Sequence, residues 1–183
     1  RNEDDLARAL DGVEAVIHLA AIVGDPQCRK HPEEAVAVNR DGSRLLCMAA
    51  ERKGVRRFIF ASTCSNYGKM TDSDGFVDET TGLRPVSLYA ETKVEFEKFL
   101  LERRSEIFEP VCLRFATAFG LSARPRFDLT LNEFTRDLWL EKKLDIYGEN
   151  YWRPYCHVAD LATACTAVLE APAATVSGES FNT

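Results

Sequence analysis

Three features are missing from this sequence, and each absence excludes a class of protein. The six cysteines include no Cys-x-x-Cys pair, so neither a zinc ribbon nor a thioredoxin-type site is indicated. Cys28 and His31 have ligand-like spacing, but nothing similar completes a metal site. The longest apolar runs, such as residues 15–23, fall well short of the roughly 18 residues that a membrane span needs. A net charge of −6 without a basic patch argues against nucleic acid and anionic membrane surfaces as partners.

What the sequence does contain is typical of one soluble domain. Its 183 residues are 45% hydrophobic and 28% charged, which is enough to bury a sizeable core. The charged opening, residues 1–5, does not resemble a signal peptide. Cys47, Cys112 and Cys165 lie in apolar stretches and are predicted to be buried, reduced thiols, which favours a cytoplasmic location.

Apolar runs of strand length alternate with helical patterns along the chain. This alternation predicts an α/β fold, with a parallel sheet and helices on both faces. Chemistry in such a sheet gathers at the carboxyl ends of the strands, which here lead into the polar segments 62–68 and 117–120. The predicted strands are residues 15–21, 57–61, 110–116, 144–147 and 179–183, and the predicted helices are 3–11, 33–53, 87–104, 129–142 and 158–170.

Tyr89 and Lys93 stand four residues apart in a predicted helix, so both side chains lie on the same helix face. A free phenol has a pKa of about 10, and a neighbouring positive charge favours the phenolate. The pair is therefore a candidate acid/base group. On spacing alone, a solvated surface pair is the alternative interpretation.

Six short motifs occur in the order in which one protein family carries them. The motifs are His-Leu-Ala-Ala at 18–21, Asn-x-x-Gly at 39–42, Ser-Thr-x-x-x-Tyr-Gly at 62–68, Tyr-x-x-x-Lys at 89–93, Leu-Arg-x-x-x-x-Phe-Gly at 113–120 and Arg-Pro-Tyr-Cys-His-Val-x-Asp at 153–160. By these motifs the chain resembles the extended short-chain dehydrogenases/reductases, in particular the NAD-dependent epimerase/dehydratase group that works on nucleotide sugars.

The resemblance implies a role for each matching residue. Tyr89 would be the general base, Lys93 would lower its pKa and hold the cofactor ribose, and Thr63 would hydrogen-bond the reacting oxygen. NAD is the implied cofactor, with NADP left open, and a nucleotide sugar is the implied substrate. The residues expected to bind the cofactor are Leu19, Ala20, Ala21, Ala61, Ser62, Tyr89, Lys93 and Phe115, and those expected to bind substrate are Thr63, Cys64, Ser65, Thr117, Asn132 and Arg153.

Several of these positions have simpler interpretations. Thr63 could instead satisfy the backbone at a strand end, Arg153 could form a surface salt bridge, and Asn132 could be ordinary helix polarity. His18 is predicted to be a hydrogen-bonded core histidine, and His157 to cap the last helix.

Cys64 and Ser65 narrow the reaction that the resemblance implies. Nucleotide-sugar 4,6-dehydratases carry Asp-Glu directly after the catalytic threonine, and a thiol and a hydroxyl are poor replacements for two carboxyls. We therefore expect epimerisation of the UDP-glucose 4-epimerase type. An NAD(P)-dependent reductase or dehydrogenase of the same fold is the alternative, and a third hypothesis is a non-catalytic fragment that cannot hold cofactor.

The ten glycines never approach the Gly-x-x-Gly-x-x-Gly spacing of the family's pyrophosphate loop. The resemblance therefore implies a Rossmann-like doubly wound sheet without its first three strands, plus part of a small substrate lobe. Residues 1–120 would be the catalytic part of the dinucleotide-binding core, 121–157 part of the substrate lobe, and 158–183 a return to the core. Either a longer chain or a partner would complete the sheet. The family also implies a homodimer built on the helix of Tyr89.

Overall fold

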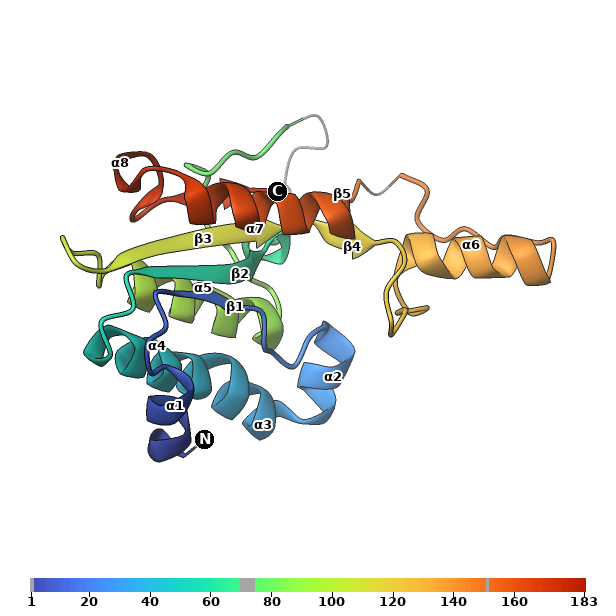
Figure 1. Cartoon of the computed structure of the whole chain (residues 1–183). Helices are drawn as coiled ribbons and strands as arrows, with labels where there is room; N and C mark the ends of the chain where they lie inside the picture. The colour runs from blue at the N-terminus through green and yellow to red at the C-terminus, as the bar shows by residue number, and fades with distance from the viewer. Residues whose placement is uncertain (1, 70–74, 151) are drawn as a thin grey trace.

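Four apolar segments pair in parallel to form the central sheet of the computed structural model, which describes residues 2–69, 75–150 and 152–183. The strands are β1 (Ala15–His18), β2 (Arg57–Thr63), β3 (Glu109–Phe115) and β6 (Ser180–Asn182), in the order β1-β2-β3-β6. Every residue of β2 is buried, as expected for a strand that is covered on both faces (Figure 1). The predicted run 15–21 is a strand only as far as His18, which pairs with Phe60, and β2 continues beyond that point.

Helices cover both faces of this sheet, as the sequence predicted. On one face, α4 (Ser43–Arg52) and α5 (Leu88–Leu101) pack with Phe58 and Phe60 of β2. On the other face, α7 (Val158–Glu170) and α8 (Ala173–Val176) pack with Ile59. Alternate strand residues thus supply two separate apolar layers. Cys47, Cys112 and Cys165 are buried free thiols, which confirms that prediction.

The long helix predicted over residues 33–53 is present, but it contains an irregular turn. It begins with α3 (Pro32–Val36), continues through a π-helical segment η1 (Ala37–Gly42), and ends as α4. The buried Asn39 lies in the π segment, where its Oδ1 accepts from the Ile22 N–H at 2.8 Å and its Nδ2 donates to the Ile22 carbonyl at 2.9 Å. The helix is thereby tied to the loop that follows β1.

Short elements complete the fold, and only the first of them was predicted. The helix predicted at 3–11 is α1 (Glu3–Ala9). A helix that was not predicted, α2 (Asp25–Lys30), follows the loop after β1. A 3-10 turn, η2 (Cys64–Tyr67), follows β2 directly. Among the described residues, no helix combines the length and apolar character that crossing a membrane requires.

Residues 121–154, here called the arm, extend away from the sheet and carry α6 (Thr130–Leu140) (Figure 1). The root of the arm is a small parallel sheet of β4 (Thr117–Phe119) and β5 (Tyr155–His157). None of the described residues of the arm is buried. The strand predicted at residues 144–147 is wrong, because this segment is irregular and pairs with no neighbouring strand among the described residues.

His18 is the core histidine that the sequence predicted. It is buried, its Nε2 lies 2.8 Å from the Ser43 Oγ, and its ring packs against Phe58, Phe60 and Phe96. Burial, together with the charge of Lys93, lowers the pKa of His18 to about 4. The imidazole is therefore neutral at neutral pH.

Candidate functional site

Tyr89 and Lys93 share one face of α5, and Lys93 ties that helix to the sheet. Ser87 caps the helix, with its Oγ accepting from the Ala90 N–H at 3.3 Å. The buried Lys93 Nζ donates to the Ala61 carbonyl at 2.7 Å and lies 5.8 Å from the centre of the Tyr89 ring. The candidate acid/base pair therefore sits against the carboxyl end of β2, and a solvated surface pair is excluded.

The electrostatics of the pair differ from the prediction. Burial raises the pKa of Tyr89 to about 12, and Cys28 and Cys64 add to this rise, while the Arg126 guanidinium opposes it. The pKa of the phenol therefore lies above the value of a free tyrosine and not below it, because desolvation of the phenolate outweighs the positive charge of Arg126. Burial also lowers the pKa of Lys93, to about 8, so its ammonium still holds its proton at neutral pH.

Thr63 is the last residue of β2 and also begins the turn that follows. Its Oγ1 accepts from the Ser65 N–H at 3.2 Å, which is the backbone-satisfying role considered for it above. Because the hydroxyl serves there as an acceptor, its own proton can still be donated to another oxygen. The turn ends at Gly68, whose φ of 73° suits glycine, and a Cβ at this position would lie 2.0 Å from the Arg84 carbonyl.

The predicted cofactor residues line the carboxyl ends of three strands. Leu19 and Ala20 are exposed and Ala21 is half-buried just after β1, whereas Ala61 and Ser62 are buried within β2. Half-buried Phe115 ends β3.

Part of this set fits one half of a dinucleotide. The Lys93 ammonium donates to the Ala61 carbonyl at 2.7 Å, and an ammonium at this strand end suits a nicotinamide riboside. No glycine-rich cradle for the pyrophosphate occurs among the 183 residues. The fit is therefore limited to the nicotinamide half.

Two segments missed at the level of sequence reach the same site. Asp25 and Cys28, both on α2, lie close enough to influence the ionisation of Tyr89. Arg126, on the arm, does so as well, and its NH2 lies 3.6 Å from where a Cβ on Gly24 would stand.

The predicted substrate residues divide into two groups. Cys64 and Ser65 lie half-buried in η2, and exposed Arg153 is near enough to oppose the rise that burial causes in the pKa of the Cys64 thiol. Asn132, by contrast, uses its amide within the arm, where Oδ1 accepts from the Gly120 N–H at 3.3 Å and Nδ2 donates to the Arg126 carbonyl at 3.1 Å. The substrate contacts of both groups stay predictions.

The root of the arm is held by contacts around His157. Its Nδ1 accepts from the Ala159 N–H at 3.2 Å and so caps α7, as predicted. The same ring packs edge-on against Phe119 and lies against Gly120, where a Cβ would come within 2.5 Å of Nε2. Thr117, another predicted substrate residue, donates its N–H to the Pro154 carbonyl at 3.0 Å.

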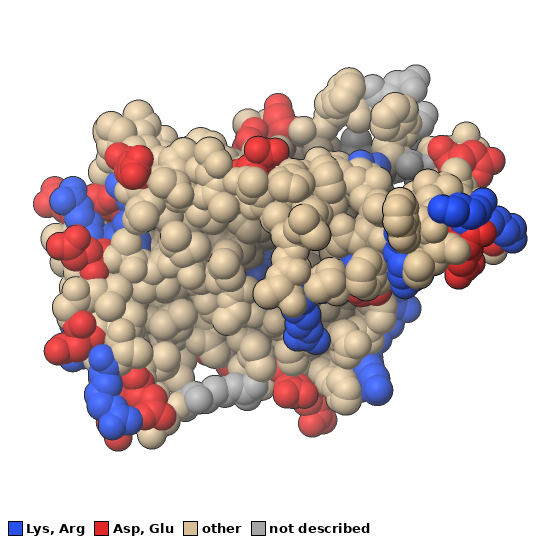
Figure 2. Space-filling model, turned by 45° about the vertical axis from the view of Figure 1, so that its right-hand side comes forward, with Lys and Arg blue, Asp and Glu red and all other residues tan. Residues whose placement is uncertain are grey.

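Charge is distributed without a single-sign field on the face shown in Figure 2. Acidic and basic side chains gather at its margins and on the arm, and mostly uncharged atoms cover its middle. An anionic substrate would therefore interact with individual arginines. Arg126 opposes the rise in the pKa of Tyr89, and Arg153 opposes the rise in the pKa of Cys64.

Comparison with known proteins agrees with this fold. The fold and site define a Rossmann-like α/β protein with a tyrosine–lysine pair at the carboxyl end of its sheet. The model of the NAD dependent epimerase/dehydratase family matches residues 1–183, and the chain belongs to that family.

Several members of this group are similar over nearly the whole chain. An uncharacterized UDP-glucose epimerase, YtcB, of Bacillus subtilis (strain 168) is 34% identical over 171 residues, which cover 92% of this chain and 52% of that protein. The structure of MoeE5 in complex with UDP-glucose and NAD has a TM-score of 0.85 at 26% identity, covering 100% of this chain and 61% of MoeE5.

The UDP-glucose 4-epimerase of Thermotoga maritima, solved with UDP-glucose, has a TM-score of 0.83 at 26% identity. The match covers 100% of this chain and 59% of that enzyme. The chain thus spans between about half and three fifths of the length of these relatives.

Proposed function

We propose that the protein is an NAD-dependent nucleotide-sugar epimerase of the UDP-glucose 4-epimerase type. The observation that supports this most is the attachment of α5 to the end of β2 through the Lys93–Ala61 hydrogen bond of 2.7 Å. That bond holds the helix of Tyr89 against the strand that ends in Thr63. A phenol, an ammonium and a hydroxyl then face one reacting oxygen, which is the set that oxidation of a secondary alcohol needs.

In this proposal Tyr89 moves the proton. Its phenolate takes the proton from a sugar hydroxyl, and in the reverse step the phenol returns a proton to the same oxygen. Thr63 donates a hydrogen bond to that oxygen and holds it in line with Tyr89. Because burial keeps the phenol protonated at pH 7, the positive charge of Arg126, which opposes the rise in the pKa of Tyr89, serves to make the phenolate accessible.

Bound NAD would accept a hydride from the sugar carbon and return it, which is chemistry that no side chain can supply. Ala61 and Lys93, which are joined by a hydrogen bond, would lie beside that half of the cofactor. If the reduced cofactor stayed bound between the two hydride transfers, NAD would be regenerated in each turnover and the net reaction would be an isomerisation.

The side chains at positions 64 and 65 favour epimerisation over loss of water. Elimination requires one group to remove a carbon-bound proton and another to protonate the leaving hydroxyl. Burial raises the pKa of the Cys64 thiol, which makes it a poor base, and Ser65 carries only a hydroxyl. Neither replaces a carboxyl.

The test measures interconversion of UDP-glucose and UDP-galactose by the full-length protein with a catalytic amount of NAD. Tyr89→Phe should lower turnover by about a hundredfold or more, because general acid–base catalysis contributes on that scale. The variant should keep its melting temperature and its affinity for NAD, since only one hydroxyl is removed.

Near-normal turnover of Tyr89→Phe would exclude Tyr89 as the base. A requirement for stoichiometric NAD(P)H in the wild-type protein would favour the reductase or dehydrogenase hypothesis instead. Absence of NAD binding by the full-length wild type would favour a non-catalytic role.

A further inference from the structure

A third residue of α5 continues the face that carries Tyr89 and Lys93. Glu97 follows Lys93 by four residues, so the three side chains lie in one line along the helix. Glu97 is 2% exposed and Lys93 is 2% exposed, so both point into the protein. The proposed reaction uses Tyr89 and Lys93 but assigns nothing to this buried carboxylate.

Glu97 contacts Ser62 at the end of β2, next to Ala61, the residue that Lys93 contacts. The Ser62 Oγ donates to the Glu97 Oε2 at 2.7 Å, while Lys93 holds the carbonyl of the adjacent Ala61. The Asn66 Nδ2 donates to both the Ser62 Oγ at 2.9 Å and the Glu97 Oε2 at 3.3 Å. Glu97 therefore contacts residues on both sides of Thr63.

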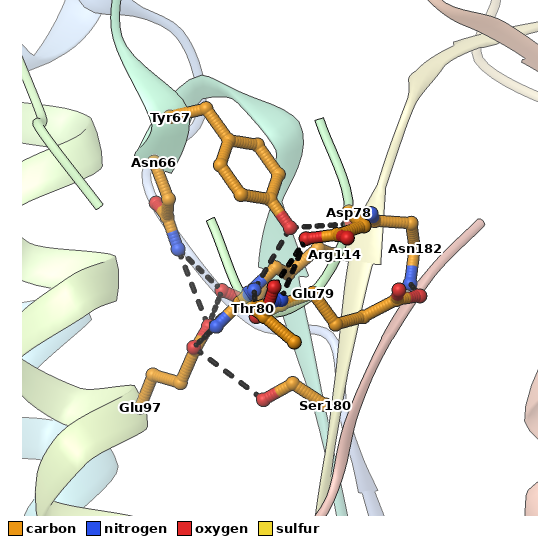
Figure 3. Close-up of polar contacts among 10 residues, drawn as sticks. Asn66, Tyr67, Asp78, Glu79, Thr80, Glu97, Arg114, Ser180 and Asn182 are labelled. Carbon is orange, nitrogen blue, oxygen red and sulfur yellow. Dashed lines mark hydrogen bonds and ion pairs between the residues drawn. The ribbon is translucent and has the colours of Figure 1, made fainter. Parts of the chain in front are cut away.

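The charge of Glu97 is paired with Arg114 of β3, as Figure 3 shows. The Arg114 Nε donates to Oε1 at 3.1 Å, and its NH2 makes a second, shorter bond to the same oxygen. Arg114 is 6% exposed, so the pair is shielded from solvent. A buried pair of this kind fixes the relative positions of its two side chains, because a displacement of either one would leave a buried charge unpaired.

The same arginine extends the network to the turn after Thr63. The Arg114 NH1 donates to the Tyr67 OH at 2.8 Å, and the Tyr67 OH donates to the Asn182 Oδ1 at 2.7 Å (Figure 3). Tyr67 ends η2, so the turn is fixed at its far end as well. Helix α5 and strands β2, β3 and β6 thus meet in one set of buried hydrogen bonds.

We propose that the buried Glu97–Arg114 pair is a positioning device that holds Thr63 at a fixed place relative to Tyr89. Glu97 touches no reacting atom, and it acts through Ser62 and Asn66. Helix α5 thus carries both Tyr89, the acid/base residue, and Glu97, which contacts the strand that ends in Thr63. This inference rests on the proposed roles of Tyr89 and Thr63.

The test compares Glu97→Gln with Glu95→Gln in the full-length protein. Glu95 is on the same helix, is exposed, and pairs only loosely with Arg40 at 3.6 Å, so it is a matched control. Glu97→Gln should lower kcat by about tenfold to a hundredfold, because a displacement of about 1 Å at the reacting groups has an effect of that size. KM should change by less than about threefold, and both apparent pKa values of the pH–rate profile should stay in place, because no titrating group of the reaction is lost.

Hydrogen exchange provides a readout that does not depend on activity. In Glu97→Gln the amides of residues 61–68 should exchange about tenfold faster or more, while those of α7 stay as in the wild type. Tyr67→Phe, which keeps the ring and removes only the hydroxyl, should change kcat and exchange in the same direction by a smaller factor.

Three outcomes would overturn the proposal. One is a Glu97→Gln protein whose kcat and exchange match those of Glu95→Gln. Another is faster exchange spread equally over α7, which would make the pair a general stabiliser only. The third is a lost limb of the pH–rate profile, which would make Glu97 an acid or base itself. If the wild type does not epimerise UDP-glucose, the proposed function fails, while the exchange comparison still tests the positioning of residues 61–68.

Discussion

The sheet with its covering helices and the arm use apolar side chains in opposite ways. In the sheet and the helices that cover it, large side chains such as Phe58, Phe96 and Leu100 are completely buried. In the arm, Trp139 is 75% exposed and Trp152 is 89% exposed. The comparison teaches that the proposed acid/base residues are set in a packed core. Arm residues such as Asn132 and Arg126 owe their places to a few polar bonds.

The largest loss of stability is expected for a substitution of Arg57, in the sheet and its covering helices, which are the packed half of the molecule. This buried guanidinium donates to Glu109 and to the carbonyls of Val168, Leu169 and Ala171, so it also closes the C-terminal end of α7. Arg57→Met should lower the free energy of unfolding by about 3–5 kcal/mol, because the Glu109 carboxylate loses its buried partner and three carbonyls lose their donor. Urea unfolding measures this. Arg56→Met, at a 70% exposed side chain that also contacts Glu109, is the control, and equal effects of the two variants would contradict the expectation.

A second prediction uses pH to destabilise the core alone. Burial lowers the pKa of His18 to about 4 from 6.5, so between these values the unfolded chain binds more protons than the folded one. Stability contributed by the neutral imidazole is present above pH 6.5 and is lost as pH falls to 4, by about 3 kcal/mol in total. Urea unfolding across this range should show a shallower decline in His18→Asn than in the wild type. Parallel curves would mean that His18 titrates normally.

A third prediction concerns the junction between the two halves. Gly120 has a φ of 119°, and an added Cβ would lie 2.5 Å from the His157 Nε2. Gly120→Ala should therefore lower the free energy of unfolding by about 1–3 kcal/mol. Gly82→Ala is the matched control, since nothing lies within 4 Å of a Cβ there, and it should be nearly neutral. Denaturant unfolding that gives the same value for both variants would refute the strain at Gly120.

The smallest effect is expected in the arm. Trp139→Ser removes a large side chain that is mostly exposed and contacts Lys142 through its ring face. The free energy of unfolding should change by less than about 0.5 kcal/mol, as for most surface substitutions. A loss of several kcal/mol in thermal or urea unfolding would show that the tryptophan is packed in solution, and the contrast between the two halves would fail.

Much of the packed half could be predicted from the sequence because its signals are local. The apolar runs around Phe58 and Val111 indicated buried strands, and the spacing of Tyr89 and Lys93 indicated a shared helix face. Position 97 continues that spacing, and this was the signal that could have revealed Glu97.

What escaped prediction depends on contacts between distant segments. Strands β4 and β5 exist only because Thr117 meets Tyr155, and neither segment alone is long enough to indicate a strand. The alternation at 144–147 suggested a strand, but no partner strand adjoins it in the described structure. The pKa of Tyr89 escaped for the same reason, since it depends on burial and on the charges of Cys28, Cys64 and Arg126, which lie far from it in sequence.

The π-helical segment η1 has a consequence for changes in chain length. A π turn contains one residue more than the α-helical turn it replaces, so it amounts to an insertion accommodated inside a helix. Removing one residue from Ala37–Gly42 would leave α3 and α4 able to continue as a single regular helix. Asn39 would then turn away from Ile22 and release the loop after β1. The extra residue in η1 therefore sets the conformation of the loop after β1, which contains Leu19 and Ala20.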